Sequence, residues 1–302
     1  MKSIIFLYTF TLLCVTSYCQ INDPLYKEGI KRFNDKDFPG ALTWFEKTIK
    51  ANPDSGVAYF MHGLTCMHLQ QAKQALADIK KSIALHYVNS LSYSYCGMIK
   101  YSLQDFKGAL EDFDEEIKLY PNIADAYNNR GSAKVKLNDC VGAVADFDKA
   151  IQLDPGDGAY WSSRGLCKAY LGSVQEGIND LNKAVTLDPN NAEAYSNLGL
   201  IELHTKDYTN ALKNLDKALA LDSTLVETHH LRGEVKLDLK DYLGALNDLN
   251  FVLKYMPEDL PAWNLRASAR MFLGDKAGAC ADYKKGLQLG GKPIPEIDKF
   301  CK

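Results

Sequence analysis

Glycine returns at one fixed interval through most of this chain. Seven glycines stand 34 residues apart without a slip, and an alanine fills the eighth position of the series: Gly29, Gly63, Gly97, Gly131, Gly165, Gly199, Gly233 and Ala267. An unbroken period of this length is the signature of stacked structural repeats. We therefore expect copies of one small unit instead of two ordinary globular domains.

Three further series keep the same period. A small residue follows each glycine position by twelve, at Ala41, Ala75, Ala109, Ala143, Gly177, Ala211, Ala245 and Ala279. A large apolar residue follows four positions later, at Phe45, Ile79, Phe113, Phe147, Leu181, Leu215, Leu249 and Tyr283. Proline closes most units, at Pro53, Pro121, Pro155, Pro189 and Pro257, with Tyr87 and Ser223 in its place twice. These series define eight repeats, 22–55, 56–89, 90–123, 124–157, 158–191, 192–225, 226–259 and 260–293.

Each unit has the pattern of two helices. Apolar residues recur three and four positions apart within two blocks, and no block alternates with period two. The sequence therefore predicts an all-α protein. A glycine inside a helix costs about 1 kcal/mol relative to alanine. We expect close packing of the two helices to offset that cost, with the small residue of the first helix against the small and large residues of the second.

At these residues the chain resembles the tetratricopeptide-repeat family, whose unit carries an aromatic residue, Leu-Gly, Ala, an aromatic residue and Pro at this spacing. The aromatic position holds Tyr59, Tyr93, Tyr127, Trp161, Tyr195 and Trp263. The resemblance implies a right-handed superhelical solenoid of about eight helix-turn-helix units over residues 20–293. It also implies a concave groove, lined by the first helix of each unit, that binds a protein or peptide.

Carried over to this sequence, the groove has two tracks of different character. Repeats 1–3 provide an apolar track: Tyr26, Ile30, Phe33, Phe60, Leu64, Met67, Met98 and Tyr101. Repeats 4–8 provide a polar track that includes Asn128, Asn129 and Asn197. Apolar side chains with flexible methionines suit an apolar peptide or helix. The alternative is that part of the apolar track is core between adjacent first helices.

Charged residues also follow the repeat. An arginine precedes the small residue of the first helix in four units, and an aspartate follows it by sixteen: Arg130 and Asp146, Arg164 and Asp180, Arg232 and Asp248, Arg266 and Asp282. Elsewhere both members change together, so that Leu198 faces Asn214 and Glu28 faces Trp44. We interpret the four pairs as structural ion pairs that set helix register.

The two ends differ from the repeats. Residues 1–19 combine Lys2 with a short apolar run and small residues before Gln20, the pattern of a cleaved secretory signal. An anchor helix and a lipoprotein signal are the alternatives. We expect a protein that is secreted or in a bacterial envelope, periplasmic or associated with the outer membrane, without a transmembrane span after cleavage. At the other end, residues 294–302 are predicted to form a cap helix.

The cysteines are then expected in a compartment that permits disulfides. Cys280 on the last repeat and Cys301 on the cap are predicted to form one. We interpret Cys66, Cys96, Cys140 and Cys167 as small packing residues, with a bridge between Cys66 and Cys96 as the alternative.

Signatures of catalysis are missing from the sequence. It contains no His-Glu-x-x-His, Cys-x-x-Cys, phosphate-binding loop or Gly-x-Ser-x-Gly motif. The adjacent His229 and His230 diverge on a helix, and the acidic run that includes Asp112 and Glu116 has the pattern of a solvated face. A net charge of -3 with mixed signs disfavours nucleic acid. We expect no catalytic residue, cofactor or metal site.

Two functions fit this sequence. The first is an exported scaffold that binds a protein or peptide along its groove and helps to assemble an envelope or extracellular complex. The alternative is a non-catalytic accessory subunit for export or for handling surface glycan or peptidoglycan. Self-association through the exposed first repeat is compatible with both.

Overall fold

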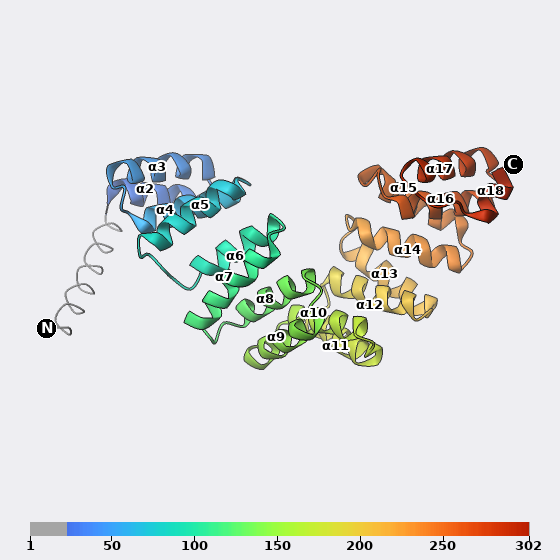
Figure 1. Ribbon diagram of the computed structural model, residues 1–302, viewed down its shortest axis with the longest axis horizontal. Coiled ribbons are helices and arrows are strands. Elements are labelled where there is room, and N and C mark those ends of the chain that lie inside the picture. Colours follow the sequence, from blue (N-terminus) through green and yellow to red (C-terminus); the bar gives the residue numbers. More distant parts are fainter. Residues whose placement is uncertain (1–22, 302) are drawn as a thin grey trace. The chain divides into compact units, whose positions relative to one another are not determined.

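The computed structural model describes residues 23–301, and the predicted signal segment lies outside them. Every regular element among these residues is an α-helix, as the sequence predicted (Figure 1). The helices are α2 (Pro24–Asn34), α3 (Phe38–Ala51), α4 (Gly56–His68), α5 (Ala72–Ala84), α6 (Ser92–Ser102), α7 (Phe106–Leu119), α8 (Ala124–Lys136), α9 (Cys140–Leu153), α10 (Gly158–Tyr170), α11 (Val174–Leu187), α12 (Ala192–His204), α13 (Tyr208–Leu221), α14 (Val226–Asp238), α15 (Tyr242–Tyr255), α16 (Leu260–Phe272), α17 (Lys276–Gln288) and α18 (Pro295–Cys301). Each predicted repeat contributes one helix pair, and α18 is the cap.

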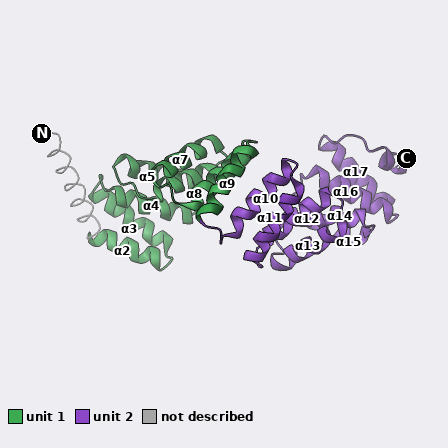
Figure 2. Ribbon diagram, turned by 90° about the horizontal axis from the view of Figure 1, so that it is seen from below, with its two compact units in different colours: residues 1–153 green, residues 154–302 purple. Residues whose placement is uncertain are grey.

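The chain divides into two compact units, Met1–Leu153 and Asp154–Lys302 (Figure 2). The first unit contains helices α2–α9, and the second contains α10–α18. Within each unit the two helices of a repeat pack together, and the second helix packs on the first helix of the next repeat. This is the nearest-neighbour arrangement of a helical-repeat solenoid. The predicted right hand of the superhelix stays a prediction.

In each of the first seven repeats, a glycine of the first helix lies against a large apolar residue of the second helix, and we call this contact the seam. A methyl group built on Gly97 would lie 2.5 Å from the ring of Phe113, and one built on Gly199 would lie 2.5 Å from Leu215. In repeat 5, where Gly177 replaces alanine, the corresponding distance from Gly165 to the carbonyl oxygen of Gly177 is 2.8 Å. These distances are too short for any side chain, so the glycine period records how closely the helices approach.

The turn inside each repeat has one backbone conformation throughout. The residue two positions before the second helix has a positive φ in all eight repeats: Lys36, Gln70, Gln104, Asn138, Gly172, Lys206, Lys240 and Gly274. In six repeats the next residue is an aspartate that accepts a hydrogen bond from the backbone N–H three positions on, as Asp241 does from Gly244 at 2.9 Å. The left-handed residue ends the first helix and the aspartate caps the second.

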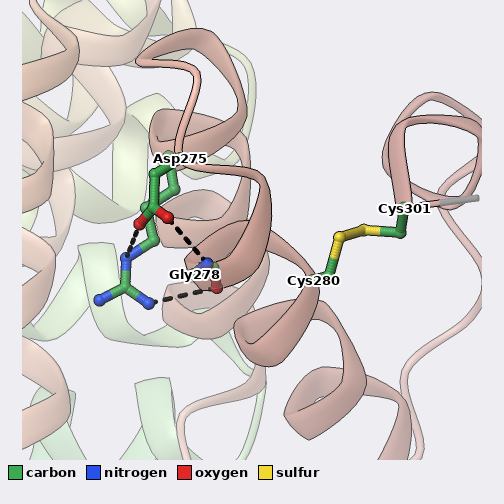
Figure 3. The surroundings of a disulfide bond; sticks show 5 residues. Asp275, Gly278, Cys280 and Cys301 are labelled. Atoms are coloured by element: carbon green, nitrogen blue, oxygen red, sulfur yellow. Dashed lines mark hydrogen bonds and ion pairs between the residues drawn. A yellow bond between two sulfur atoms is a disulfide. The ribbon is translucent and has the colours of Figure 1, made fainter.

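The cap is held on the last repeat by packing and by a disulfide. Ile297 of α18 is 1% exposed and packs with Ala267 and Tyr283. The predicted Cys280–Cys301 disulfide is present, with the two Cα atoms 5.5 Å apart (Figure 3). The other four described cysteines are buried thiols, so Cys66 and Cys96 are not bridged.

Between residues 23 and 301, no helix combines enough length with enough apolar character to cross a bilayer.

Candidate functional site

The predicted apolar track divides into core and surface. Tyr26 and Phe60, at the start of α2 and α4, are only 8% and 4% exposed. The ring of Phe60 lies 5.7 Å from that of Tyr87, and Tyr87 also packs against the cluster that contains Tyr26. The expectation that these two rings line an accessible groove is therefore wrong. They pack against the turn that ends repeat 2, where Tyr87 replaces proline.

A pocket lies next to this core, on the first helices of repeats 1–3. It has a volume of about 410 Å³ and is lined by Phe33 of α2, by Leu64, Met67 and His68 of α4, and by Tyr95 of α6. The His68 ring fixes one side, because it stacks on Phe38 at 4.2 Å and meets the edge of Phe33 at 5.3 Å. Three helices therefore present an apolar hollow with a histidine in its wall.

Sequence reasoning identified Phe33, Leu64 and Met67 but missed His68 and Tyr95. Tyr95 stands 34 residues before Asn129 and 102 before Asn197, in the register that was assigned to the polar track. Extending that register backwards would have found it. His68 gave no such signal, because its place in the pocket depends on stacking with Phe38.

The remaining track residues lie outside the pocket lining. Met98 is 45% exposed, and Tyr101 packs edge-on against Phe106 with ring centroids 5.2 Å apart. Ile30 packs on the core cluster of repeat 1. These side chains belong to the same series of first helices, but they do not converge on one hollow.

One asparagine of the polar track forms a hydrogen bond within the fold. The amide of Asn197 donates to the Ser162 hydroxyl at 3.1 Å, which links α12 to α10. The side-chain oxygen of Asn128 is buried without a hydrogen-bond partner among residues 23–301. Asn129 is half-buried. Asn128 and Asn129 belong to the first unit and Asn197 to the second.

The four predicted ion pairs form, and each aspartate has a second cation. The arginine Nε donates to the aspartate at 3.0, 2.7, 2.9 and 2.8 Å in repeats 4, 5, 7 and 8. Four residues after the arginine, a second basic side chain reaches the same aspartate in each repeat: Lys134, Lys168, Lys236 and Arg270. The aspartates are 2–6% exposed. We call these three positions, the arginine, the second cation and the aspartate, the charge slot.

Arginines of the charge slot also connect successive repeats. Arg130 reaches back to Asp114 at 2.7 Å, and Arg232 reaches back to Asp216 at 2.7 Å. Arg266 donates to Asn250 at 2.8 Å in the same way. The partner in the preceding repeat is exposed and the partner in the same repeat is buried. The arginine therefore fixes both the helix pair and its stacking.

Repeat 2 fills the charge slot with different chemistry. Its three positions hold His62, Cys66 and Asp78, and all three residues are buried. The Nδ1 atom of His62 lies 2.7 Å from an oxygen of Asp78 and 3.8 Å from the sulfur of Cys66. Burial alone would lower the pKa of His62, but its hydrogen bond to the Asp78 carboxylate, its contact with Cys66 and the negative charge of these groups outweigh burial and raise the pKa to about 9. This cluster is the set of residues in the described chain that could hold a metal ion.

Buried acids appear in repeat 3 where a solvated face was expected. Lys100 pairs with Asp112 at 2.7 Å. Glu116 is 2% exposed, and burial raises its pKa to about 7, although a hydrogen bond with Ser94 lowers it in part. The interpretation of this run as a solvated face is therefore wrong at Glu116, because that position faces the next repeat and holds alanine at Ala150, Ala184 and Ala218.

The aromatic residue at the start of the first helix donates a hydrogen bond to the preceding turn in three repeats. Trp161 and Trp263 donate from the indole N–H to the carbonyl oxygens of Pro155 and Pro257, at 3.1 and 2.9 Å. The Tyr127 hydroxyl donates to Pro121 at 3.0 Å. Charge-slot arginines lie over the two tryptophan rings, at 4.8 and 4.6 Å from their centroids. These aromatic residues therefore have structural partners.

Comparisons with known proteins agree with this geometry. Sequence models described as "Tetratricopeptide repeat" match residues 97–158, 192–225 and 260–289, and one described as "TPR repeat" matches residues 165–203. A search of curated proteins gives no significant match.

Solved structures show the same fold at low identity. A tetratricopeptide repeat protein from Parabacteroides merdae has a TM-score of 0.70 and 15% identity, over 81% of this chain and 97% of the other. The protein pilF from Pseudomonas aeruginosa has a TM-score of 0.62 and 17% identity, over 70% and 96%. A chain of the APC/C hetero-tetramer Cut9-Hcn1 has a TM-score of 0.70 and 15% identity, over 88% and 53%. These structures show the shared fold, and the four repeat matches show that this chain belongs to the tetratricopeptide-repeat family.

Proposed function

We propose that this chain is an exported scaffold that binds a protein or peptide segment through the pocket of repeats 1–3. The observation that carries the proposal is the apolar hollow lined by Phe33, Leu64, Met67, His68 and Tyr95. Binding clefts have volumes of about 300–1,000 Å³ and mostly apolar walls with a few polar groups. Family membership supports a scaffold role, because tetratricopeptide-repeat proteins are generally non-catalytic and bind other proteins or peptides.

The lining residues indicate what the occupant presents. Phe33, Leu64 and Tyr95 offer apolar surface, and the unbranched Met67 adapts to the shape of its neighbour. His68 supplies one polar group in the wall. An apolar side chain carried by a peptide would fill the hollow, and its backbone would lie along the first helices. This is the groove mode of peptide recognition, in which a few anchors supply most of the binding energy.

Export is the second part of the proposal and has a separate basis. The pattern of residues 1–19 supports it, and the Cys280–Cys301 disulfide is compatible with an oxidising compartment. Mass determination of the mature protein from the producing cells should give a chain that begins at Gln20. A mature chain that still carries residues 1–19 would contradict export by cleavage.

The binding experiment uses peptides selected on the immobilised full chain from a random library. Selected peptides should share an apolar anchor residue, and Met67→Glu should weaken their binding at least tenfold, measured by fluorescence anisotropy. Met98→Glu is the matched control, because it makes the same change at an exposed position outside the pocket lining. Equal affinity for wild type and Met67→Glu would contradict the pocket as the binding site. Phe60 is unsuitable for this test, since its ring is core.

A further inference from the structure

Repeat 2 differs from the other repeats in how its buried aspartate is neutralised. In repeats 4, 5, 7 and 8 two basic side chains contact the aspartate of the charge slot. Repeat 3 retains one of them, Lys100, beside Asp112, although Cys96 takes the arginine position. In repeat 2 both permanent cations are gone, and His62 and Cys66 stand in their places beside Asp78.

We propose that His62, Cys66 and Asp78 bind a divalent transition-metal ion, for which Zn²⁺ has the best-matched chemistry. The ligand atoms of the three residues lie within 4.8 Å of one another. A neutral imidazole, a thiolate and a carboxylate are the three ligand types that Zn²⁺ takes in proteins. Two of these ligands are anionic, so a divalent cation makes the buried group neutral and supplies the positive charge that two basic side chains supply in the other repeats.

The distances are close to those of a tetrahedral site. Zn–N and Zn–S bonds of about 2.0 and 2.3 Å place the nitrogen and sulfur about 3.5 Å apart, and a Zn–O bond of about 2.1 Å places the nitrogen and oxygen about 3.3 Å apart. The Nδ1 atom of His62 lies 3.8 Å from the Cys66 sulfur and 2.7 Å from the Asp78 oxygen. When a metal replaces the proton between His62 and Asp78, the nitrogen–oxygen distance must widen by about 0.6 Å, through a rotation of Asp78, and the nitrogen–sulfur distance must shorten by about 0.3 Å.

Surrounding groups fit the role of a supporting shell. The Gln74 amide donates to both oxygens of Asp78, at 3.0 and 3.2 Å, and so orients the carboxylate. His62 is held because it lies on α4 beside Gly63, whose methyl position would be 2.8 Å from Ile79 of α5. The helix pair therefore fixes ligands that are sixteen residues apart in sequence. Search patterns for metal motifs look for shorter spacings, which is why the sequence predicted no metal site.

Cobalt titration tests the proposal directly. The tag-free, full-length protein, with its thiols confirmed as reduced and its Cys280–Cys301 disulfide intact, is titrated anaerobically with Co²⁺. A thiolate-to-cobalt charge-transfer band should rise, saturate at one equivalent per chain and disappear when Zn²⁺ is added. Zn²⁺ alone should also raise the melting temperature of the wild-type protein. A wild-type protein that gives no such band would overturn the proposal.

Two variants separate this site from other thiols and from simple loss of fold. The double variant His62→Arg, Cys66→Lys restores the residue pattern of repeat 7, so it should stay folded, give no cobalt band and lose the stabilisation by Zn²⁺. Cys96→Ala removes a buried thiol of the same core cluster that is not a proposed ligand, and it should keep both. If the double variant keeps the cobalt band, the metal binds at another site. Loss of the band in Cys96→Ala alone would indicate that this other site includes Cys96.

Discussion

Repeats 2 and 7 show what the repeat architecture fixes and what it leaves variable. Both contain the same helix seam, since a methyl group on Gly63 would lie 2.8 Å from Ile79 and one on Gly233 would lie 3.1 Å from Leu249. Their charge slots differ at two of three positions. Repeat 7 holds Arg232, Lys236 and Asp248, and repeat 2 holds His62, Cys66 and Asp78. The close approach of the two helices is thus kept when the residues of the charge slot change.

Repeat 6 also keeps the seam while its charge slot changes, because an acid stands at a cation position and an amide stands at the aspartate position. Glu202 stands at the second-cation position and accepts a hydrogen bond from Asn214, which stands at the aspartate position, at 2.7 Å. Leu198 takes the arginine position and is 2% exposed. The seam from Gly199 to Leu215 is nevertheless as close as in the other repeats. In repeats 2 and 4–8 the slot holds a buried acid with a polar or charged partner, and several residue combinations provide that partner.

Removal of the slot carboxylate should have the largest effect, and a different one in the two repeats. Asp248→Asn in repeat 7 leaves Arg232, Lys236 and His229 around a neutral amide, and we expect a loss of about 3–5 kcal/mol of stability. Asp78→Asn in repeat 2, in the metal-free protein, should cost only about 1–2 kcal/mol, because His62 can release its proton. Urea unfolding followed by circular dichroism measures both values.

The control for this prediction uses the same arginine. Asp216 also contacts Arg232, at 2.7 Å, but its side chain is 53% exposed. Asp216→Asn should therefore cost less than about 1 kcal/mol. Equal losses for Asp248→Asn and Asp78→Asn would show that the two permanent cations of repeat 7 make no difference to the slot.

Repeat 3 can be compared with repeats 4–6 at the position four residues after the slot aspartate on the second helix. Glu116 occupies a site that alanine fills in those repeats, and its pKa is raised by burial to about 7. The folded chain therefore holds this proton more tightly than the unfolded chain. Its contribution to stability is present below about pH 4.5 and is lost as the pH rises through 7. Glu116→Gln should remove this loss and stabilise the protein by about 2 kcal/mol at pH 8.

The measurement is the melting temperature of wild type and Glu116→Gln between pH 5 and pH 8. The two proteins should converge at the acid end and separate at the alkaline end. Glu115→Gln is the control, since Glu115 is 46% exposed and pairs only with the exposed Lys118. A constant difference between wild type and Glu116→Gln over the whole range would mean that the Glu116 carboxyl does not titrate there.

The sequence predicted those features that every repeat shares. The seam, the helix pairs and the four arginine pairs follow from residues that recur often enough for one spatial arrangement to explain them all. The disulfide was predicted separately, from one cysteine on the last repeat and one on the cap. Several features that occur in one repeat alone were missed, because no recurring residue marks them. Tyr26 and Phe60 were assigned to the groove from the family resemblance, but both rings lie in core clusters to which Tyr87 of the following turn also contributes. His62 and Cys66 would have been found by comparing whole slots and not only arginines.

The smallest predicted effect concerns the turn inside each repeat, where repeats 7 and 8 differ only in the residue that adopts the left-handed conformation. Lys240 has a φ of 64° in repeat 7, and Gly274 has a φ of 78° in repeat 8 with nothing within 4 Å of a methyl group there. Gly274→Ala should therefore cost about 1 kcal/mol through backbone strain alone. Lys240→Gly relieves that strain but makes the unfolded chain more flexible, so we expect a net gain of less than about 0.5 kcal/mol. Urea unfolding resolves the sign. A loss with Lys240→Gly as large as that with Gly274→Ala would show that the lysine side chain stabilises the turn and that the two repeats are not equivalent there.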